Sequence, residues 1–142
     1  MTSEEEAEEI REVNARFYRA FESLDLAEME GIWAKELYVQ CVHPGWGLLS
    51  GWEAVRASWE AIFRNTAEIR FTIRDVQVHV EGTLACVTCA EDILSETRGN
   101  IGVTSVLATN IFEQRGGQWL LIHHHASHVF TERAEPESPE SV

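Results

Sequence analysis

The sequence contains few basic residues. Its 142 residues include 11 Lys and Arg against 24 Asp and Glu, and the formal net charge is −13 at pH 7. Binding to DNA or RNA depends on clustered Lys and Arg side chains that neutralise phosphates and release counterions. The composition therefore argues against nucleic acid as a partner. Much of the acidic excess lies near the two ends of the chain, where its simplest role is solubility.

Long apolar runs are also absent. No stretch of the sequence approaches the roughly 18 uninterrupted apolar residues that a membrane-spanning helix needs. The first nine residues are acidic, whereas a signal peptide begins with a basic and then an apolar segment. We therefore expect a protein of the cytoplasm with no membrane partner.

Cysteine is scarce, at three residues: Cys41, Cys86 and Cys89. An odd number in a chain without an export signal favours reduced thiols over a disulfide framework. Cys86 and Cys89 match the C-x-x-C pattern, but a redox motif places its first thiolate at a helix N-terminus. Here the sequence indicates a strand, which points the two side chains to opposite faces. We expect no disulfide and two small core residues.

The length and composition fit one folded domain. Hydrophobic residues make up 44% of the chain and five residues are Trp, which is enough apolar surface for one core. We expect a single domain over residues 1–130. The remaining residues, 131–142, are acidic and include Pro136 and Pro139, and we expect this tail to be disordered.

Three helices are predicted in the first half of the chain. Each is introduced by a pair of residues with the spacing of a capping box, followed by apolar residues three and four positions apart. The second helix is predicted to be shorter than the first. The pairs are Ser3 with Glu6, Asp25 with Glu28, and Ser50 with Glu53.

The segment from Leu37 to His43 alternates in the manner of a short strand and is broken by Pro44 and Gly45. After Asn65 the sequence indicates strands to the end of the domain. Three of them are predicted at residues 84–96, 103–114 and 118 to about 130, with Gly116-Gly117 forming the last turn.

In the strand before these, apolar residues change face near Arg74 and Asp75. Phe71 and Ile73 lie on one face, whereas the valines from Val76 onward lie on the other. A β-bulge at this point would restore the register and bend the strand. Because helices come first and long strands follow without alternation, the sequence predicts an α+β layered fold.

The last hairpin brings together a set of polar side chains. If Gly116-Gly117 is a two-residue turn, counting outward from it pairs Asn110 with His123 on one face of the hairpin. Trp119 and Ser127 lie on the same face. His124 and His128 would then point to the opposite face. The predicted pairs are Arg115 with Gln118, Phe112 with Leu121, Asn110 with His123, and Ala108 with His125.

Glu91 is the carboxylate that the simplest strand register brings close to Ala108 and Asn110, with Asp92 as the alternative. A carboxylate, an amide and two imidazoles on one face could bind a polar ligand or transfer protons near neutral pH. The same residues could instead form a buried polar network that fixes the register of the sheet.

His123 and His125 have the i, i+2 spacing found in some metal sites. Two imidazoles need a third or fourth ligand, and the sequence supplies none at a fixed spacing. We therefore predict no metal site.

The loop at residues 43–46 contains His43 and Trp46 next to Pro44 and Gly45, and it precedes the third helix. Such a loop is suited to form the lip of a pocket. Trp59 could also line that pocket, although a Trp at helical spacing is more often a core residue.

The order of predicted elements and three local patterns resemble a known family. These are His43-Pro44 followed by Gly51-Trp52, the run from Ala108 to Phe112, and Trp119-x-x-x-His123-x-His125-x-Ser127. Over roughly residues 3–130 the sequence resembles the SnoaL-like branch of the nuclear transport factor 2-like superfamily. The last pattern is also similar to the association domain of calcium/calmodulin-dependent protein kinase.

The resemblance implies a fold and a range of functions. The fold is a cone-shaped, curved antiparallel β-sheet wrapped around N-terminal helices, called cystatin-like or nuclear transport factor 2-like, commonly as a homodimer. The family includes isomerases, cyclases, dehydratases and hydrolases, as well as non-catalytic assembly domains, so the fold does not select one reaction.

We therefore expect a small-molecule-binding domain, with acid–base chemistry that uses no cofactor as one function and a non-catalytic dimerisation or assembly module as the alternative. His125 and Glu91 are the candidate catalytic residues. The candidate ligand-binding residues are His43, Trp46, Trp59, Asn110, Phe112, His123 and Ser127.

Overall fold

The structure is a computed structural model that describes residues 2–130. The predicted acidic tail at 131–142 lies outside the described residues.

The first helix, α1 (Ser3–Ser23), begins with a capping box one residue earlier than predicted. The Thr2 hydroxyl accepts a hydrogen bond from the Glu5 backbone N–H at 3.0 Å, and the Glu5 carboxylate accepts one from the Thr2 N–H at 2.8 Å. The predicted pair of Ser3 with Glu6 is therefore wrong. The predicted apolar stripe is confirmed, and its buried members are Ile10, Val13, Phe17, Ala20 and Phe21.

The second helix, α2 (Leu26–Glu30), begins after Asp25 as predicted. The Asp25 carboxylate accepts a hydrogen bond from the Ala27 N–H at 3.0 Å. The helix has five residues and ends with Gly31 as its C-cap. Two buried residues, Ile32 and Trp33, therefore lie in the segment that follows the helix.

Two short strands precede the third helix: β1 (Gln40–Val42) lies inside the predicted strand, whereas β2 (Leu49–Ser50) was not predicted. The helix α3 (Trp52–Asn65) starts after Gly51, whose φ of 90° is a conformation that favours glycine. Ser50 pairs with Gln40 in the sheet and makes no cap. The predicted capping role of Ser50 is therefore wrong.

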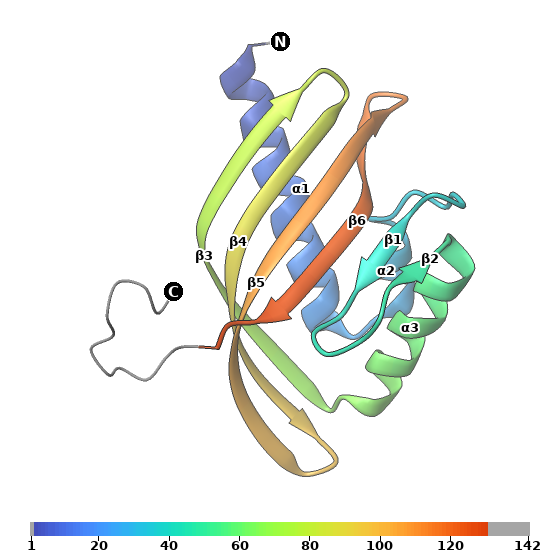
Figure 1. Cartoon of the computed structure of the whole chain (residues 1–142), viewed down its shortest axis with the longest axis vertical. Helices are drawn as coiled ribbons and strands as arrows, with labels where there is room; N and C mark the ends of the chain where they lie inside the picture. Colours follow the sequence, from blue (N-terminus) through green and yellow to red (C-terminus); the bar gives the residue numbers. More distant parts are fainter. Residues whose placement is uncertain (1, 131–142) are drawn as a thin grey trace, which may run out of the picture.

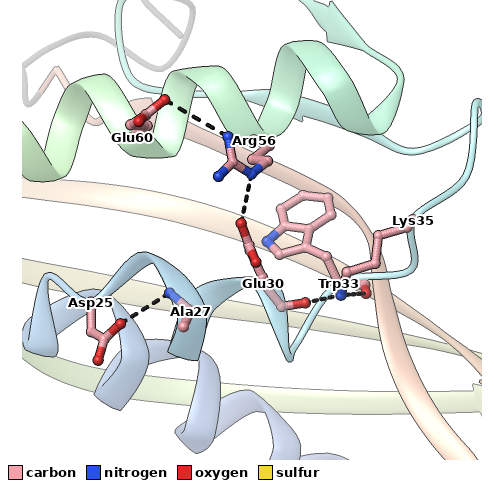
Figure 2. A network of polar contacts seen from close by, with 7 residues as sticks. All are labelled: Asp25, Ala27, Glu30, Trp33, Lys35, Arg56 and Glu60. Carbon is pink, nitrogen blue, oxygen red and sulfur yellow. Dashed lines mark hydrogen bonds and ion pairs between the residues drawn. The ribbon is translucent and has the colours of Figure 1, made fainter.

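One ion pair connects the end of α2 to α3 (Figure 2). Arg56 on α3 donates from its Nε to the Glu30 carboxylate at 2.6 Å, and its Nη1 lies 3.8 Å from the Glu60 carboxylate. The Lys35 ammonium donates to the main-chain oxygens of Glu30 and Trp33. Because the Arg56 pairs are partly exposed, each contributes about 1 kcal/mol or less.

Four long strands form most of the sheet, as predicted: β3 (Glu68–Glu81), β4 (Leu84–Thr97), β5 (Asn100–Arg115) and β6 (Gln118–His128). They pair antiparallel in sequence order. β1 joins β6 in parallel, so the six-stranded sheet has the order β2-β1-β6-β5-β4-β3 and is mixed. The α+β class is confirmed, and the purely antiparallel sheet is corrected by this one parallel pair.

The bulge predicted in β3 is confirmed. The pairing of β3 with β4 shifts between Arg74 and Gln77, and Asp75 has a φ of 58°. The extra residue restores the alternation of faces, and such bulges bend a strand.

The pairing of β5 with β6 begins as predicted and then shifts. Arg115 pairs with Gln118 and Phe112 with Leu121, but the register changes between Ile111 and Phe112. From the pair Phe112–Leu121 to the pair Ile111–His123 the chain advances by one residue on β5 and by two on β6, so a second bulge lies on β6. The extra residue turns every later side chain of β6 to the other face. The predicted pairs beyond the bulge are wrong: Asn110 pairs with His124, and Ala108 with Ala126.

The helices lie on one face of the curved sheet, with α1 running along the long strands and α3 beside β1 and β2 (Figure 1). One core fills the space between them. Its largest fully buried side chains include Phe17 from α1, Trp59 from α3 and Phe112 from β5. Within residues 2–130, no helix has the length and apolar character that crossing a membrane requires.

Candidate functional site

A pocket of about 240 Å³ lies where the β1–β2 loop, α3 and the sheet meet. We call it the end pocket. His43, Pro44 and Trp46 from the loop border it, which agrees with the predicted lip. Trp46 is 45% exposed at its edge, whereas His43 is only 2% exposed. The other lining residues are Phe21, Ile62, Ile69, Ile93, Ser95, Thr104, Val106 and His128.

His43 belongs to a small buried group, the His43 cluster, which consists of His43, Ser58 and Cys41. The His43 Nε2 lies 2.9 Å from the Ser58 Oγ, and the Ser58 hydroxyl donates to the Val55 carbonyl oxygen at 2.7 Å. The Cys41 sulfur lies 3.6 Å from the His43 Nε2. Burial lowers the pKa of His43 to about 4, so its imidazole is neutral at pH 7. Burial also raises the pKa of the Cys41 thiol, which is therefore protonated.

A second buried group, the Glu91 cluster, consists of Glu91, Tyr18, Asn110, Asn14 and His124. Glu91 is 2% exposed, and its Oε2 accepts a hydrogen bond from the Tyr18 hydroxyl at 2.5 Å. Burial raises the pKa of the Glu91 carboxyl from 4.5 to about 7, although the Tyr18 hydrogen bond opposes the shift. Glu91 can therefore hold or release a proton near neutral pH.

Asn110 connects the two ends of the Glu91 cluster. Its Nδ2 donates to the Asn14 Oδ1 at 2.9 Å and to the Tyr18 hydroxyl oxygen at 3.2 Å. Its Oδ1 lies 2.6 Å from the His124 Nδ1, which must therefore carry the proton and donate. The bonds form one directed series of donors, from His124 through Asn110 and Tyr18 to the Glu91 carboxylate.

His124 is neutral in this series. Burial, followed by the neighbouring His43, lowers its pKa well below the usual value for histidine. The two clusters are adjacent, because the rings of His43 and His124 are 6.3 Å apart between centroids. Phe17 and Trp59 pack against the His124 ring and complete the apolar surroundings.

Glu91 lies directly behind the wall of the end pocket. It shares a face of β4 with Ile93, a lining residue two positions further along the strand. Across the sheet it pairs with Val106 on β5, which also lines the pocket. Glu91 is not itself a lining residue, so a ligand in the end pocket can reach the carboxyl only if side chains of the pocket wall are displaced.

Three predicted site residues lie on the other face of β6. His123 is half-buried, and His125 and Ser127 are exposed, because the bulge before them reverses the alternation. The shared face predicted for Asn110, His123 and His125 is therefore wrong, and His124 occupies the inner position. Glu91 has Tyr18 as its partner instead of His125.

The remaining predicted residues are buried in the core or lie elsewhere. Trp59 is fully buried and packs edge-on against His43, with 4.7 Å between ring centroids. Phe112, on β5, is fully buried in the core. Asp92, the alternative to Glu91, points to the opposite face and forms an exposed ion pair with Arg74 at 2.7 Å.

Cys86 and Cys89 lie on opposite faces of β4, as predicted, and all three cysteines are free. Within residues 2–130, no three His, Cys, Asp or Glu side chains are grouped in a way that could hold a metal ion.

The sequence analysis missed three members of the site on helices. Asn14 and Tyr18 lie four residues apart within the apolar stripe of α1, and both are buried. A polar pair at that spacing on a buried face is a signal that was available, because buried polar groups need partners. Ser58 gave no such signal, because its role follows from the position of His43.

A second hollow, of about 280 Å³, lies between α1 and the β5–β6 turn. Its titratable lining residues are Glu9, Glu12 and Arg16, all exposed at the surface. It contains no member of either buried cluster, so the end pocket remains the better candidate site.

Residues 10–131 match the SnoaL-like domain family. Among solved structures, an NTF2-like family protein from Streptomyces avermitilis, provisionally named a dehydratase, is 38% identical with a TM-score of 0.86. The match covers 92% of this chain and 100% of that one. A protein from Thiobacillus denitrificans, provisionally named a calcium/calmodulin-dependent protein kinase type II association domain, is 28% identical with a TM-score of 0.73. Here the match covers 83% of this chain and 93% of that one.

The F-box protein SKIP8 of Arabidopsis thaliana is 30% identical over 115 residues. These residues make up 81% of this chain and 47% of that protein, so the chain spans about half the length of this relative. The resemblance inferred from the sequence is confirmed by the family match and by the two structures.

Proposed function

The chain belongs to the SnoaL-like domain family, and from this premise we propose that it binds a small organic molecule in the end pocket and transfers a proton through Glu91. The pocket is mainly apolar with a few polar groups, which is the usual composition of a small-molecule site. Its volume of about 240 Å³ suits a ligand smaller than a typical drug.

The observation that carries the proposal is the raised pKa of Glu91. A carboxyl with a pKa of about 7 is present in both protonation states near neutral pH. General acid–base catalysis is most effective when the pKa of the group lies close to the working pH. Glu91 would accept a proton from a carbon or oxygen of the ligand as carboxylate, and donate one as carboxylic acid.

The directed hydrogen bonds of the Glu91 cluster support this role. The Tyr18 hydroxyl donates to the carboxylate and is itself held by the Asn110 amide. The Tyr18 hydrogen bond favours the ionised form and offsets part of the cost of burial, so the carboxylate keeps a hydrogen-bond donor after it loses its proton. Asn110 and His124 would act as positioning residues, since they are connected to the Glu91 carboxylate only through the Tyr18 hydroxyl.

Proton transfer is common to the reactions of the family, and dehydration is one candidate. In such a step the carboxylate removes a proton from carbon, the C–H electrons form a double bond, and the resulting carboxylic acid gives that proton to the hydroxyl, which leaves as water. The provisional name of the Streptomyces avermitilis protein is consistent with this class. Proton removal from carbon is the part of the step that the raised pKa of Glu91 supports.

Exchange of carbon-bound hydrogen tests the proposal without knowledge of the natural substrate. Cyclohexanone in D2O is a suitable probe, because enolisation replaces its α-hydrogens by deuterium and proton NMR follows their loss. We expect the protein to accelerate the exchange, with a pH profile that rises through about 7, and Glu91→Gln to abolish the acceleration. His125→Gln, on the outer face, is the matched control and should retain it. Acceleration that persists in Glu91→Gln would contradict the proposal.

The alternative, a non-catalytic assembly domain, is favoured by one observation. The polar groups of the Glu91 cluster are paired with one another, as in a network that only fixes the fold. This role predicts that neither the wild type nor any variant accelerates the exchange above its background rate.

We also propose a homodimer formed through the outer face of the sheet, where Leu107 is 53% exposed and the half-buried Leu120 and Ile122 lie on β6. Light scattering should give twice the chain mass of 16.1 kDa. A monomer mass at micromolar concentration would contradict it, and Leu107→Glu should shift the mass toward the monomer.

A further inference from the structure

The orientation of His43 limits which ligands the end pocket can accept. The Ser58 hydroxyl has one hydrogen, which it donates to the Val55 carbonyl oxygen at 2.7 Å. That carbonyl oxygen can only accept. The Ser58 Oγ must therefore accept at its 2.9 Å contact with the His43 Nε2, so Nε2 carries the proton of the imidazole.

The second ring nitrogen then has a lone pair. A neutral imidazole has one N–H, and at His43 this proton is on Nε2, so Nδ1 is an acceptor. Its only polar neighbour among the described residues is the Cys41 thiol, at 3.9 Å, which is a weak and distant donor. His43 is held in place by edge-on contacts with Trp46 and Trp59, at 4.9 and 4.7 Å between ring centroids. His43 lines the end pocket, and because Nε2 is bound to Ser58, Nδ1 is the ring nitrogen left to accept a hydrogen bond from a ligand.

Charge in the pocket wall restricts the ligand further. Among the described lining residues there is no Lys, Arg, Asp or Glu, and the other polar members are Ser95, Thr104 and His128. An ionised ligand would lose its hydration without gaining an opposite charge, which is costly. An uncharged ligand avoids this cost.

We propose that the end pocket selects an uncharged, mainly apolar molecule with a hydroxyl or N–H group that donates a hydrogen bond to the His43 Nδ1. This inference rests on the proposed function only in that the end pocket binds a ligand, and it does not depend on proton transfer by Glu91. His43 is then the residue that determines specificity, and Ser58 is the residue that sets its tautomer.

Three probes of similar size separate these requirements: 4-ethylphenol, 1-ethyl-4-fluorobenzene and 4-ethylbenzoate. The first has a donor, the second replaces the hydroxyl by fluorine, and the third is an anion. Titration of the labelled protein, followed by amide NMR shifts of the lining residues, gives a dissociation constant for each. We expect the phenol to bind about tenfold more tightly than the fluoro compound, as one net hydrogen bond predicts. The benzoate should bind more weakly than either.

Two variants test the assignment to His43. His43→Phe keeps the ring but removes the acceptor, so the phenol and fluoro compound should bind within about twofold of each other. Ser58→Ala releases Nε2 and lets the ring adopt either tautomer, so the preference should narrow while the fold is retained. His125→Phe is the matched control on the outer face and should keep the wild-type preference.

The outcomes distinguish the two proposals. If none of the probes shifts the lining residues of the wild-type protein, the end pocket does not bind such ligands, and both this inference and the binding part of the proposed function fail. If the probes bind but the benzoate is preferred, or if His43→Phe keeps the preference for the phenol, only the present inference is overturned.

Discussion

The Glu91 cluster and the His43 cluster are adjacent in one core, yet their hydrogen bonds leave different groups free. In the Glu91 cluster the donors run in series and end on a carboxylate. In the His43 cluster the bond to Ser58 occupies one ring nitrogen and leaves the other without a strong partner. The Glu91 cluster can take up or release a proton, whereas the His43 cluster can accept a hydrogen bond from a ligand.

Burial acts on both clusters but in opposite directions. It raises the pKa of Glu91 to about 7 and lowers that of His43 to about 4, because in each case it disfavours the charged form. The comparison shows that burial alone does not identify a functional residue. The roles of Glu91 and His43 differ because the two side chains lie differently relative to the end pocket and have different numbers of hydrogen-bond partners.

Removing the centre of the Glu91 cluster should have the largest effect. Asn110→Ala removes the hydrogen-bond partner of the Asn14 oxygen and of the His124 N–H, and it removes one of the donors to the Tyr18 oxygen. We expect a loss of about 3–5 kcal/mol in the free energy of unfolding, measured by denaturant titration. Thr109→Ala, on the neighbouring half-buried position, should cost about 1 kcal/mol or less. A loss below about 1 kcal/mol for Asn110→Ala would show that the cluster is not held through this residue.

The pH dependence of stability should distinguish the clusters. Because the folded-state pKa of Glu91 is raised from 4.5 to about 7, its contribution is fully present below about pH 4.5 and is lost as the pH rises through 7. The shift corresponds to at most about 3 kcal/mol. Its counterpart, His43, has a lowered pKa, so its contribution is present above pH 6.5 and is lost as the pH falls toward 4.

Glu91→Gln isolates the first of these effects, because an amide cannot ionise. We expect denaturant unfolding between about pH 5 and 8 to show that the free energy of unfolding of the wild type falls relative to that of the variant as the pH rises. A constant difference over this range would mean that Glu91 does not titrate there.

The smallest expected effects separate the inner and outer faces of β6. His124→Gln disturbs a fully buried ring bonded to Asn110 and should cost about 2 kcal/mol, whereas His125→Gln at an exposed position should stay within about 0.5 kcal/mol. Thermal or chemical unfolding measures both. Equal losses would contradict the register of the β5–β6 hairpin.

The elements of the fold could be predicted because each has a local signal. Apolar spacing in α1, the turn at Gly116-Gly117 and the change of face at Arg74 all depend on residues close in sequence. The short strand β2 has no such signal, because its two residues form a strand only through pairing with β1.

The candidate site was predicted in part. Glu91, Asn110, His43 and Trp46 were identified, but the bulge on β6 reversed the positions of the three consecutive histidines. Nothing in the local sequence marks this bulge, since no glycine or change of apolar face occurs there. One extra residue in a strand was therefore enough to exchange His124 for His123 and His125.

The central claim is that Glu91 changes its protonation state near neutral pH inside the core. Carbon-13 NMR of the glutamate carboxyl groups, with Glu91→Gln used to assign the signal, measures this titration directly. The account predicts a midpoint at about 7 and a higher midpoint in Tyr18→Phe, because the Tyr18 hydrogen bond lowers the pKa of Glu91. A midpoint near the ordinary value of 4.5 would contradict the claim and, with it, the assignment of Glu91 to proton transfer.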